Sequence, residues 1–385
     1  MKALVIGAGL TGAVIARCLA EECNIQVTVY DRRDHIGGNM YDYYDEHHIL
    51  VHKYGPHIFH TNDKKLFDYV NQFAKWNHFK MICRSSINGK ITPIPFNFQT
   101  IDDFYSPEEA ADLKNRLIKY FGDKKKVTVF EVLQAKEEKI RAYGQFLFEN
   151  DYKPYTSKQW GLSYSEIDTS ILERVPLRLT YEDGYFDDKY QALPEHGYTE
   201  FLKAIFDHPN IKIELGIEAL DHLKIDNNVM LIDGKPCNML VIYTGVLEEL
   251  FSLKYGRLPY RSLAFEWKFE NINSKQTVPM IAYPQVNGFT RIIEYKKLPK
   301  QDVNGTTYAI EFPISYTGAR GEEPYYPVLN KKSQILYNKY LTRVKKVENL
   351  FCAGRLADFK YYNMDQVLVR ALEVCETLKR KYGKA

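Results

Sequence analysis

The stretch Lys2-Ala-Leu-Val-Ile-Gly-Ala-Gly-Leu-Thr-Gly12 opens with a short continuous apolar run, Ala3 to Ile6, typical of a buried parallel strand. Residues 7–12 form a turn, and residues 13–22 have the apolar spacing of a helix. A second apolar run, Ile25-Gln-Val-Thr-Val-Tyr30, ends at Asp31. Strand, glycine turn, helix and strand within about 30 residues predict a βαβ unit, and with it an α/β fold.

The three glycines of this turn have the spacing of a dinucleotide-binding fingerprint. Gly7 permits the tight turn, Gly9 lets backbone amides approach a diphosphate at the helix N-terminus, and Gly12 lets helix and strand pack closely. Asp31, at the end of the second strand, is placed to accept hydrogen bonds from a ribose. A glycine turn in an unrelated α/β protein is the alternative interpretation.

Two further glycine motifs indicate which dinucleotide is bound. Gly37-Gly38-Asn39 follows Asp31 after five spacers, and its amides can reach a cofactor phosphate or the edge of a flavin. This arrangement resembles flavin enzymes more than nicotinamide dehydrogenases. Near the other end of the chain, the apolar strand Asn349-Leu-Phe-Cys-Ala-Gly-Arg355 ends in glycine before a helix, which resembles the second FAD contact of the flavin enzymes. We therefore expect FAD.

The rest of the chain indicates a discontinuous Rossmann-like FAD-binding domain with an inserted helical lobe and an antiparallel β-sheet lobe. Strand candidates at residues 211–215 and 239–245 belong to the first domain. Helical spacing follows Ser106, a good N-cap, and Pro107, while short alternating runs between residues 255 and 316 predict antiparallel strands. The predicted boundaries are 1–80, 195–250 and 340–385 for the FAD-binding domain, 100–178 for the helical domain, and 81–99, 179–194 and 251–339 for the sheet domain.

The composition narrows the functional class. A formal net charge of +3 is small for a nucleic-acid binder, and no apolar run approaches the roughly 18 residues that span a bilayer. The chain opens without a charged segment leading into an apolar run, and its six cysteines are scattered, with no zinc spacing. The 30 tyrosines offer stacking faces and hydroxyls suited to sugar and phosphate recognition, although many must be packing residues. We expect a soluble cytoplasmic protein with reduced thiols, no metal, and neither nucleic acid nor membrane as partner.

Side-chain motifs for nucleophilic or metal catalysis do not occur in the sequence, which has no GxSxG, HExxH or GxxxxGK[ST] pattern. His57 and His60, in Gly55-Pro-His-Ile-Phe-His-Thr61, are a candidate metal or base pair. They suit packing and hydrogen bonding equally well. We expect them to line the face of a flavin.

A series of segments then carries a more specific resemblance, in order along almost the whole chain. The segments are Tyr54-Gly-Pro-His-Ile-Phe-His-Thr-Asn62, Pro95-Phe-Asn97, Lys158-Gln-Trp-Gly161, Arg174-Val-Pro-Leu-Arg178, Gly184-Tyr-Phe186, Tyr260-Arg-Ser-Leu263, Phe289-Thr-Arg-Ile-Ile-Glu294, Glu323-Pro-Tyr-Tyr-Pro327 and Gly354-Arg-Leu-Ala-Asp-Phe-Lys-Tyr-Tyr362. The sequence is similar to the bacterial UDP-galactopyranose mutase family.

The resemblance implies an enzyme that interconverts the pyranose and furanose forms of a nucleotide sugar, foremost UDP-galactopyranose and UDP-galactofuranose. In that family the FAD must be reduced, its N5 attacks the anomeric carbon, the diphosphate leaves, and no net redox occurs. A cofactor nucleophile removes the need for a side-chain nucleophile. A cellular flavin reductant is then required, and a homodimer is expected.

The same resemblance assigns roles to individual side chains. Arg174 and Arg291 stabilise the leaving diphosphate, Arg174 from a mobile lid that belongs to the helical domain. His60 is the third catalytic candidate, and Tyr155 and Trp160 resemble residues that line the nucleotide channel. The implied substrate-binding residues are Tyr155, Trp160, Arg174, Tyr185, Phe186, Arg261, Arg291, Tyr325, Tyr361 and Asn363, and the cofactor-binding residues are Gly7, Gly9, Leu10, Thr11, Gly12, Asp31, Arg32, Gly38, Asn39, His57, Ile58, Arg355 and Met364.

Three positions depart from the family pattern. Asn363 stands where the family commonly has Asp, Met81 where it often has Asn, and Asp151-Tyr152-Lys153-Pro154 replaces the usual approach to Tyr155. These departures fall where sugar and nucleotide bind, so an N-acetylated, deoxy or heptose nucleotide is an alternative substrate. An FAD-dependent oxidoreductase of the amine-oxidase type and a non-catalytic nucleotide-sugar or FAD-binding protein are the alternatives from other classes.

Overall fold

The computed structural model describes residues 1–163, 175–319 and 321–383. Its central element is a five-stranded parallel sheet in the order β12-β2-β1-β16-β22. The strands are β1 (Lys2–Ile6), β2 (Gln26–Asp31), β12 (Ile211–Leu215), β16 (Leu240–Tyr243) and β22 (Leu350–Cys352). Segments from the beginning, middle and end of the chain thus pair side by side, which confirms the discontinuous Rossmann-like fold.

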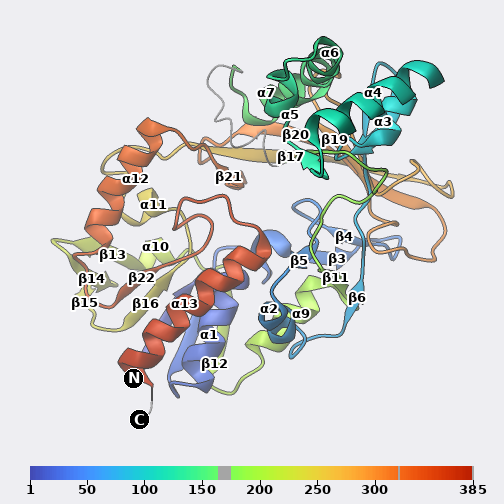
Figure 1. The fold of residues 1–385 in the computed structure, drawn as a ribbon. Helices are drawn as coiled ribbons and strands as arrows, with labels where there is room; N and C mark the ends of the chain where they lie inside the picture. The colour runs from blue at the N-terminus through green and yellow to red at the C-terminus, as the bar shows by residue number, and fades with distance from the viewer. Residues whose placement is uncertain (164–174, 320, 384–385) are drawn as a thin grey trace.

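The alternation of β1 explains why both faces of this sheet are covered. Ala3 and Val5 lie in one core with α1 (Leu10–Glu21), α9 (Gly197–Phe206) and α13 (Met364–Tyr382). Leu4 and Ile6 point the other way, into a second core that α11 (Leu247–Leu250) and α12 (Lys331–Val344) close. Helix α10 (Ala219–His222) and a small antiparallel sheet of β13 (Leu223–Asp226), β14 (Val229–Ile232) and β15 (Lys235–Pro236) also belong to this side (Figure 1).

The second large sheet has seven strands in the order β21-β17-β20-β19-β18-β7-β8. They are β7 (Cys83–Ile87), β8 (Lys90–Ile94), β17 (Tyr260–Glu270), β18 (Met280–Ala282), β19 (Arg291–Glu294), β20 (Thr306–Ser315) and β21 (Tyr326–Pro327). The predicted antiparallel lobe is present, with one difference: β18 pairs with β7 in parallel. This pair joins strands from two distant chain segments, so no hairpin sets their direction.

The predicted helical lobe covers this sheet (Figure 1). It contains α3 (Phe98–Phe104), α4 (Pro107–Phe121), α5 (Val129–Leu133), α6 (Glu138–Leu147), the π-helix η2 (Phe148–Tyr152) and α7 (Lys153–Trp160). Ser106 caps α4 in a reciprocal pair with Glu109, and Pro107 takes the first helical position, as the sequence predicts. The predicted domain boundaries remain predictions.

Shorter elements connect the lobes. They are η1 (Gly38–Met40), β3 (Asp42–Tyr44) paired with β4 (Leu50–His52), the sheet of β5 (Phe59–Thr61), β11 (Tyr190–Pro194) and β6 (Trp76–His78), α2 (Lys64–Val70), and β9 (Lys126–Val127) paired with β10 (Leu177–Arg178). Among the described residues, no helix combines the length and apolarity needed to cross a membrane.

Candidate functional site

A first cavity opens at the carboxyl ends of the parallel strands, beside Ile6 of β1, Asp31 of β2 and Tyr243 of β16. Ligands of open α/β sheets bind at this edge. Most of the predicted cofactor residues lie in its wall: Gly7, Gly9, Leu10, Thr11, Asp31, Arg32, Gly38, Asn39, His57, Arg355 and Met364. The sequence therefore identified residues that the fold brings together from both ends of the chain.

The turn before α1 leaves its helix N-terminus open. Gly9 is the N-cap residue, no side chain caps the helix, and its first turn carries no acidic residue. The first backbone bond of the helix runs from Ala13 N–H to the Gly9 carbonyl, so the amides of residues 10–12, in the first turn, can donate to a ligand. Gly12 is outside the cavity wall, and a Cβ there would lie 1.9 Å from the Gly7 carbonyl oxygen. Its task is close packing of helix on strand.

The carboxylate of Asp31 holds the loop that borders the cavity. Its Oδ2 accepts from Ala8 N–H at 2.7 Å and its Oδ1 from Arg33 N–H at 2.9 Å. The guanidinium of Arg33 bonds Glu323 through Nε at 3.2 Å and Nη2 at 2.5 Å. Its Nη1 is buried and has no partner within the described ranges. Sequence reasoning missed Arg33 and Glu323, which both line the cavity; the only signal was their place next to Asp31 and within a matched segment.

The two histidines of the Gly55–Thr61 segment lie in different surroundings. His57 lines the first cavity, and its Nδ1 lies 2.9 Å from the Gly55 carbonyl oxygen. A carbonyl only accepts, so Nδ1 carries the proton and Nε2 is left as an acceptor. Burial lowers the pKa of His57 to about 3, helped by nearby His52 and Arg355, so the ring is neutral at physiological pH.

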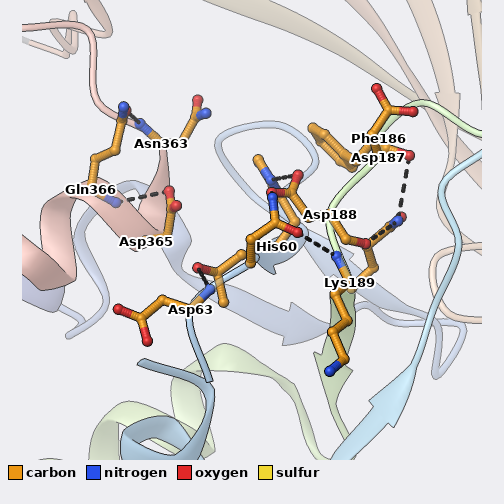
Figure 2. Close-up of polar contacts among 12 residues, drawn as sticks. His60, Asp63, Phe186, Asp187, Asp188, Lys189, Asn363, Asp365 and Gln366 are labelled. Carbon is orange, nitrogen blue, oxygen red and sulfur yellow. Dashed lines mark hydrogen bonds and ion pairs between the residues drawn. The ribbon is translucent and has the colours of Figure 1, made fainter. Parts of the chain in front are cut away.

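His60 lies outside both cavity walls, on β5, where Figure 2 shows it beside Asp188 and Phe186. Its Nδ1 is 2.8 Å from Asp188 Oδ2, and its ring stacks on Phe186 with centroids 3.8 Å apart. Asp365, in the first turn of α13, faces this pair: burial raises its pKa, His60 lowers it and Asp188 raises it. This group of charges stands beside the candidate site rather than in its wall.

A second cavity lies between the helical lobe and the seven-stranded sheet. Of the predicted substrate residues, its wall contains Tyr155, Trp160, Tyr185, Arg291 and Tyr361. The lining also contains residues that sequence reasoning missed, among them Met280, Tyr326 and Gln159, and it contains Asp151, which the sequence marks only as a departure from the family pattern. These residues come from strands β18 and β21, helix α7 and the π-helix η2, and no local sequence pattern predicts that these elements meet.

Arg291 is the one cation among the described residues that line the second cavity. It is held by Glu311 of the adjacent strand, whose Oε2 accepts from Nε at 2.9 Å and from Nη2 at 2.7 Å. Its Nη1 contacts the Met280 sulfur at 3.4 Å. Burial alone would lower the pKa of Arg291, but the charge of fully buried Glu311 outweighs burial and raises it well above its ordinary value. A fixed, fully charged guanidinium suits an anionic ligand.

The two cavities adjoin at Arg355. This residue lines the first cavity, while its guanidinium carbon lies 5.8 Å from the ring centre of Tyr326 and 5.6 Å from that of Tyr361, which line the second. The rings of Tyr326 and Tyr361 are 5.1 Å apart, and Trp160 packs on both. The aromatic cluster of Trp160, Tyr326 and Tyr361 therefore lies where the two cavities meet.

The other predicted residues that the structure describes lie outside the lining of both cavities. Arg261 bonds the Gln159 carbonyl through Nε at 3.0 Å, which anchors the end of α7 behind Trp160. Asn363 is the N-cap residue of α13, and its backbone N–H donates to Gln366 Oε1 at 2.9 Å. Phe186 stacks on His60, while Ile58 and Tyr325 are buried. Arg174 and the predicted lid lie outside the described residues. No cluster of metal-ligating side chains occurs among the described residues.

Comparison with known proteins agrees with this geometry. A family model for UDP-galactopyranose mutase matches residues 150–361, and one for an NAD(P)-binding Rossmann-like domain matches residues 5–73. A probable UDP-galactopyranose mutase of Klebsiella pneumoniae is 37% identical over 378 residues, which cover 97% of this chain and 93% of that protein. The chain belongs to the UDP-galactopyranose mutase family. A second relative, the dTDP-fucopyranose mutase of Escherichia coli, is 34% identical and covers 100% of this chain and 99% of its own.

Solved structures extend the likeness of fold. A reduced UDP-galactopyranose mutase superposes with a TM-score of 0.73 at 16% identity, covering 99% of this chain and 94% of that one. A putative protoporphyrinogen oxidase from Exiguobacterium sp. 255-15 follows with a TM-score of 0.62 at 12% identity, covering 99% of each chain. At these identities the likeness concerns the fold alone.

Proposed function

We propose that the protein is an FAD-dependent mutase that interconverts the pyranose and furanose forms of a nucleotide sugar, foremost UDP-galactopyranose and UDP-galactofuranose. The observation that carries the proposal is the junction of two cavities at Arg355, one with a dinucleotide-binding turn and one with a fixed cation and aromatic walls. Because a relative acts on dTDP-fucopyranose, a deoxy sugar nucleotide is the alternative substrate.

The residues of the first cavity fit FAD. The open amides at the start of α1 suit the diphosphate, Asp31 suits a ribose, and the unpartnered Nη1 of Arg33 suits a further oxygen acceptor. Gly9 and Gly38 face each other so closely that a Cβ on Gly38 would lie 3.1 Å from the Gly9 Cα, which leaves their backbones bare toward the cavity. Bound there in its reduced form, FAD supplies the nucleophile for the anomeric carbon without net redox.

The chain's own residues bind, orient and exclude water. Arg291 binds the diphosphate and stabilises its charge as it leaves. Trp160, Tyr326 and Tyr361 surround the sugar and keep it against the cofactor cavity. His57 accepts a hydrogen bond through Nε2 at the cofactor cavity, because its Nδ1–H is committed to Gly55.

We also propose that the enzyme works in the cytoplasm, with a cellular flavin reductant. Its six free cysteines suit the reducing cytoplasm, where a cellular reductant would keep the flavin reduced. A homodimer is proposed on family resemblance alone.

The test is an anaerobic assay of purified, FAD-loaded protein with UDP-galactofuranose, following UDP-galactopyranose by chromatography. Product should form with dithionite-reduced protein and not with the oxidised protein. Oxygen consumption that depends on substrate would instead support the oxidoreductase. Activity on dTDP-fucofuranose with none on the galactose pair would keep the reaction and change the sugar.

A further inference from the structure

Asp151 is the one carboxylate among the described residues that line the second cavity. It lies in the π-helix η2, one turn before Tyr155, and is 7% exposed. Ser85 Oγ–H donates to its Oδ1 at 2.5 Å. No described residue donates to Oδ2, and no described cation lies within ion-pair distance of the carboxylate. The second oxygen of a buried carboxylate that lines the cavity therefore has no partner among the described residues.

The nearby lysine does not neutralise this carboxylate. Lys158 Nζ donates to the carbonyl oxygens of Tyr283 at 2.6 Å and Val286 at 2.5 Å, and lies 3.3 Å from that of Pro284. An ammonium group has three donors, and these carbonyls occupy them. A partnerless buried acceptor is unfavourable in the free protein, so a ligand that donates a hydrogen bond to it gains affinity.

The register of the sheet shows which part of a ligand meets Asp151. Arg291, Ala282 and Ser85 are directly paired across β19, β18 and β7. Two strand spacings, about 10 Å, separate Arg291 from Ser85. The junction with the cofactor cavity lies at Tyr326, on β21 at the other edge of the sheet order.

A nucleotide sugar that reacts at the cofactor must place its sugar at the Tyr326 edge and its diphosphate at Arg291. Its base then lies toward Ser85, beside Asp151. A carboxylate also repels the diphosphate, which favours the same orientation.

On this basis, and resting on the proposed function, we propose that Asp151 selects the nucleobase by accepting a ring N–H through Oδ2. Uracil and thymine carry such a donor at N3, and cytosine carries a bare acceptor at the same position. Asp151 therefore admits uridine and thymidine diphosphate sugars alike and rejects cytidine diphosphate sugars. The 5-methyl group that distinguishes thymine from uracil does not meet this contact.

The substitution Asp151→Asn tests the contact because Ser85 orients the amide. Its hydroxyl donates to Oδ1, so Nδ2 takes the place of Oδ2 and presents a donor to the cavity. We expect calorimetry on FAD-loaded wild-type protein to show UDP and dTDP binding about tenfold or more tighter than CDP. In the variant that ratio should fall about tenfold or reverse. Glu149→Gln is the matched control: it removes an exposed carboxylate from the same π-helix and should keep the wild-type ratio.

A second comparison needs no variant. A methyl group on N3 of UDP removes the donor and should abolish the preference, whereas a methyl group on C5 should leave affinity within about twofold. An unchanged UDP-to-CDP ratio in folded Asp151→Asn, full affinity for the N3-methyl nucleotide, or tightest binding of GDP each overturns the assignment of Asp151. Absence of binding by every nucleotide to wild-type protein would instead overturn the proposed function.

Discussion

At the scale of single residues, the burial of Asp151 predicts how the free energy of unfolding depends on pH. Burial raises its pKa from 3.8 to about 6, against the Ser85 hydrogen bond and the Lys158 charge, which lower it. The folded protein thus holds this proton more tightly than the unfolded chain, so the free energy of unfolding falls as pH rises from about 4 to about 6. Above pH 6 the full penalty, about 3 kcal/mol, is present.

Asp151→Asn should therefore be more stable than wild type at pH 7.5 without nucleotide, by up to about 3 kcal/mol. The difference should shrink toward zero as the pH approaches 4, where the wild-type carboxyl is protonated in the fold. Urea denaturation of both proteins at several pH values measures this, with Glu149→Gln as the exposed control. A variant that loses stability at pH 7.5 would mean that the ionised carboxylate supports the fold.

At the scale of elements, two glycines at the turn between β1 and α1 have different tasks: Gly12 is needed for folding, and Gly9 for binding the cofactor. Gly9 has an extended backbone, with φ −82° and ψ −174°, and the nearest atom to an added Cβ is 3.7 Å away. At Gly12 the same addition meets the Gly7 carbonyl oxygen at 1.9 Å. The fold has room for a methyl group at the first position and none at the second.

We expect Gly9→Ala to keep the free energy of unfolding of the apoprotein within about 1 kcal/mol but to lower FAD affinity at least tenfold, because the methyl group enters the cavity. Gly12→Ala should instead destabilise the apoprotein itself, by about 2 kcal/mol or more, because the helix must move away from the strand. Apoprotein denaturation and flavin titration, measured on both variants, separate the two effects. Full FAD affinity in Gly9→Ala would show that the turn does not approach the cofactor.

Elements whose signals are local could be predicted from the sequence. The βαβ unit follows from two apolar runs and a glycine turn, and the start of α4 follows from Ser106 and Pro107. The π-helix η2 could not be predicted, because a single turn of five residues is too short to show a period of its own. The parallel pairing of β7 with β18 could not be predicted either, because the two strands are about 200 residues apart and tertiary contacts determine their pairing.

At the scale of the whole molecule, the same division holds for the site. Gly7, Asp31 and Arg355 belong to motifs that can be recognised in the sequence, and the fold places all three in the wall of one cavity. Arg33 and Tyr326 could not be predicted, because only the pairing of distant chain segments places them in the walls of the two cavities. Asp151 was visible as a departure from the family pattern, but its burial and its unpartnered oxygen required the structure.

The cofactor cavity is built from the beginning, middle and end of the chain, so FAD should stabilise the molecule as a unit. At 100 times its dissociation constant, FAD should raise the free energy of unfolding by about 2.7 kcal/mol. FMN lacks the adenosine that the Asp31 side of the cavity suits, and should raise it much less at the same concentration. Trp160 of α7 and Trp267 of β17 lie in the helical and seven-stranded lobes, and Trp76→Phe removes the third tryptophan, which packs on α9 beside the five-stranded sheet. If the lobes unfold together, tryptophan fluorescence and far-ultraviolet circular dichroism shift by the same amount with FAD. A fluorescence transition that ignores FAD would mean that the substrate lobes unfold on their own, and that the cofactor does not hold the second cavity together.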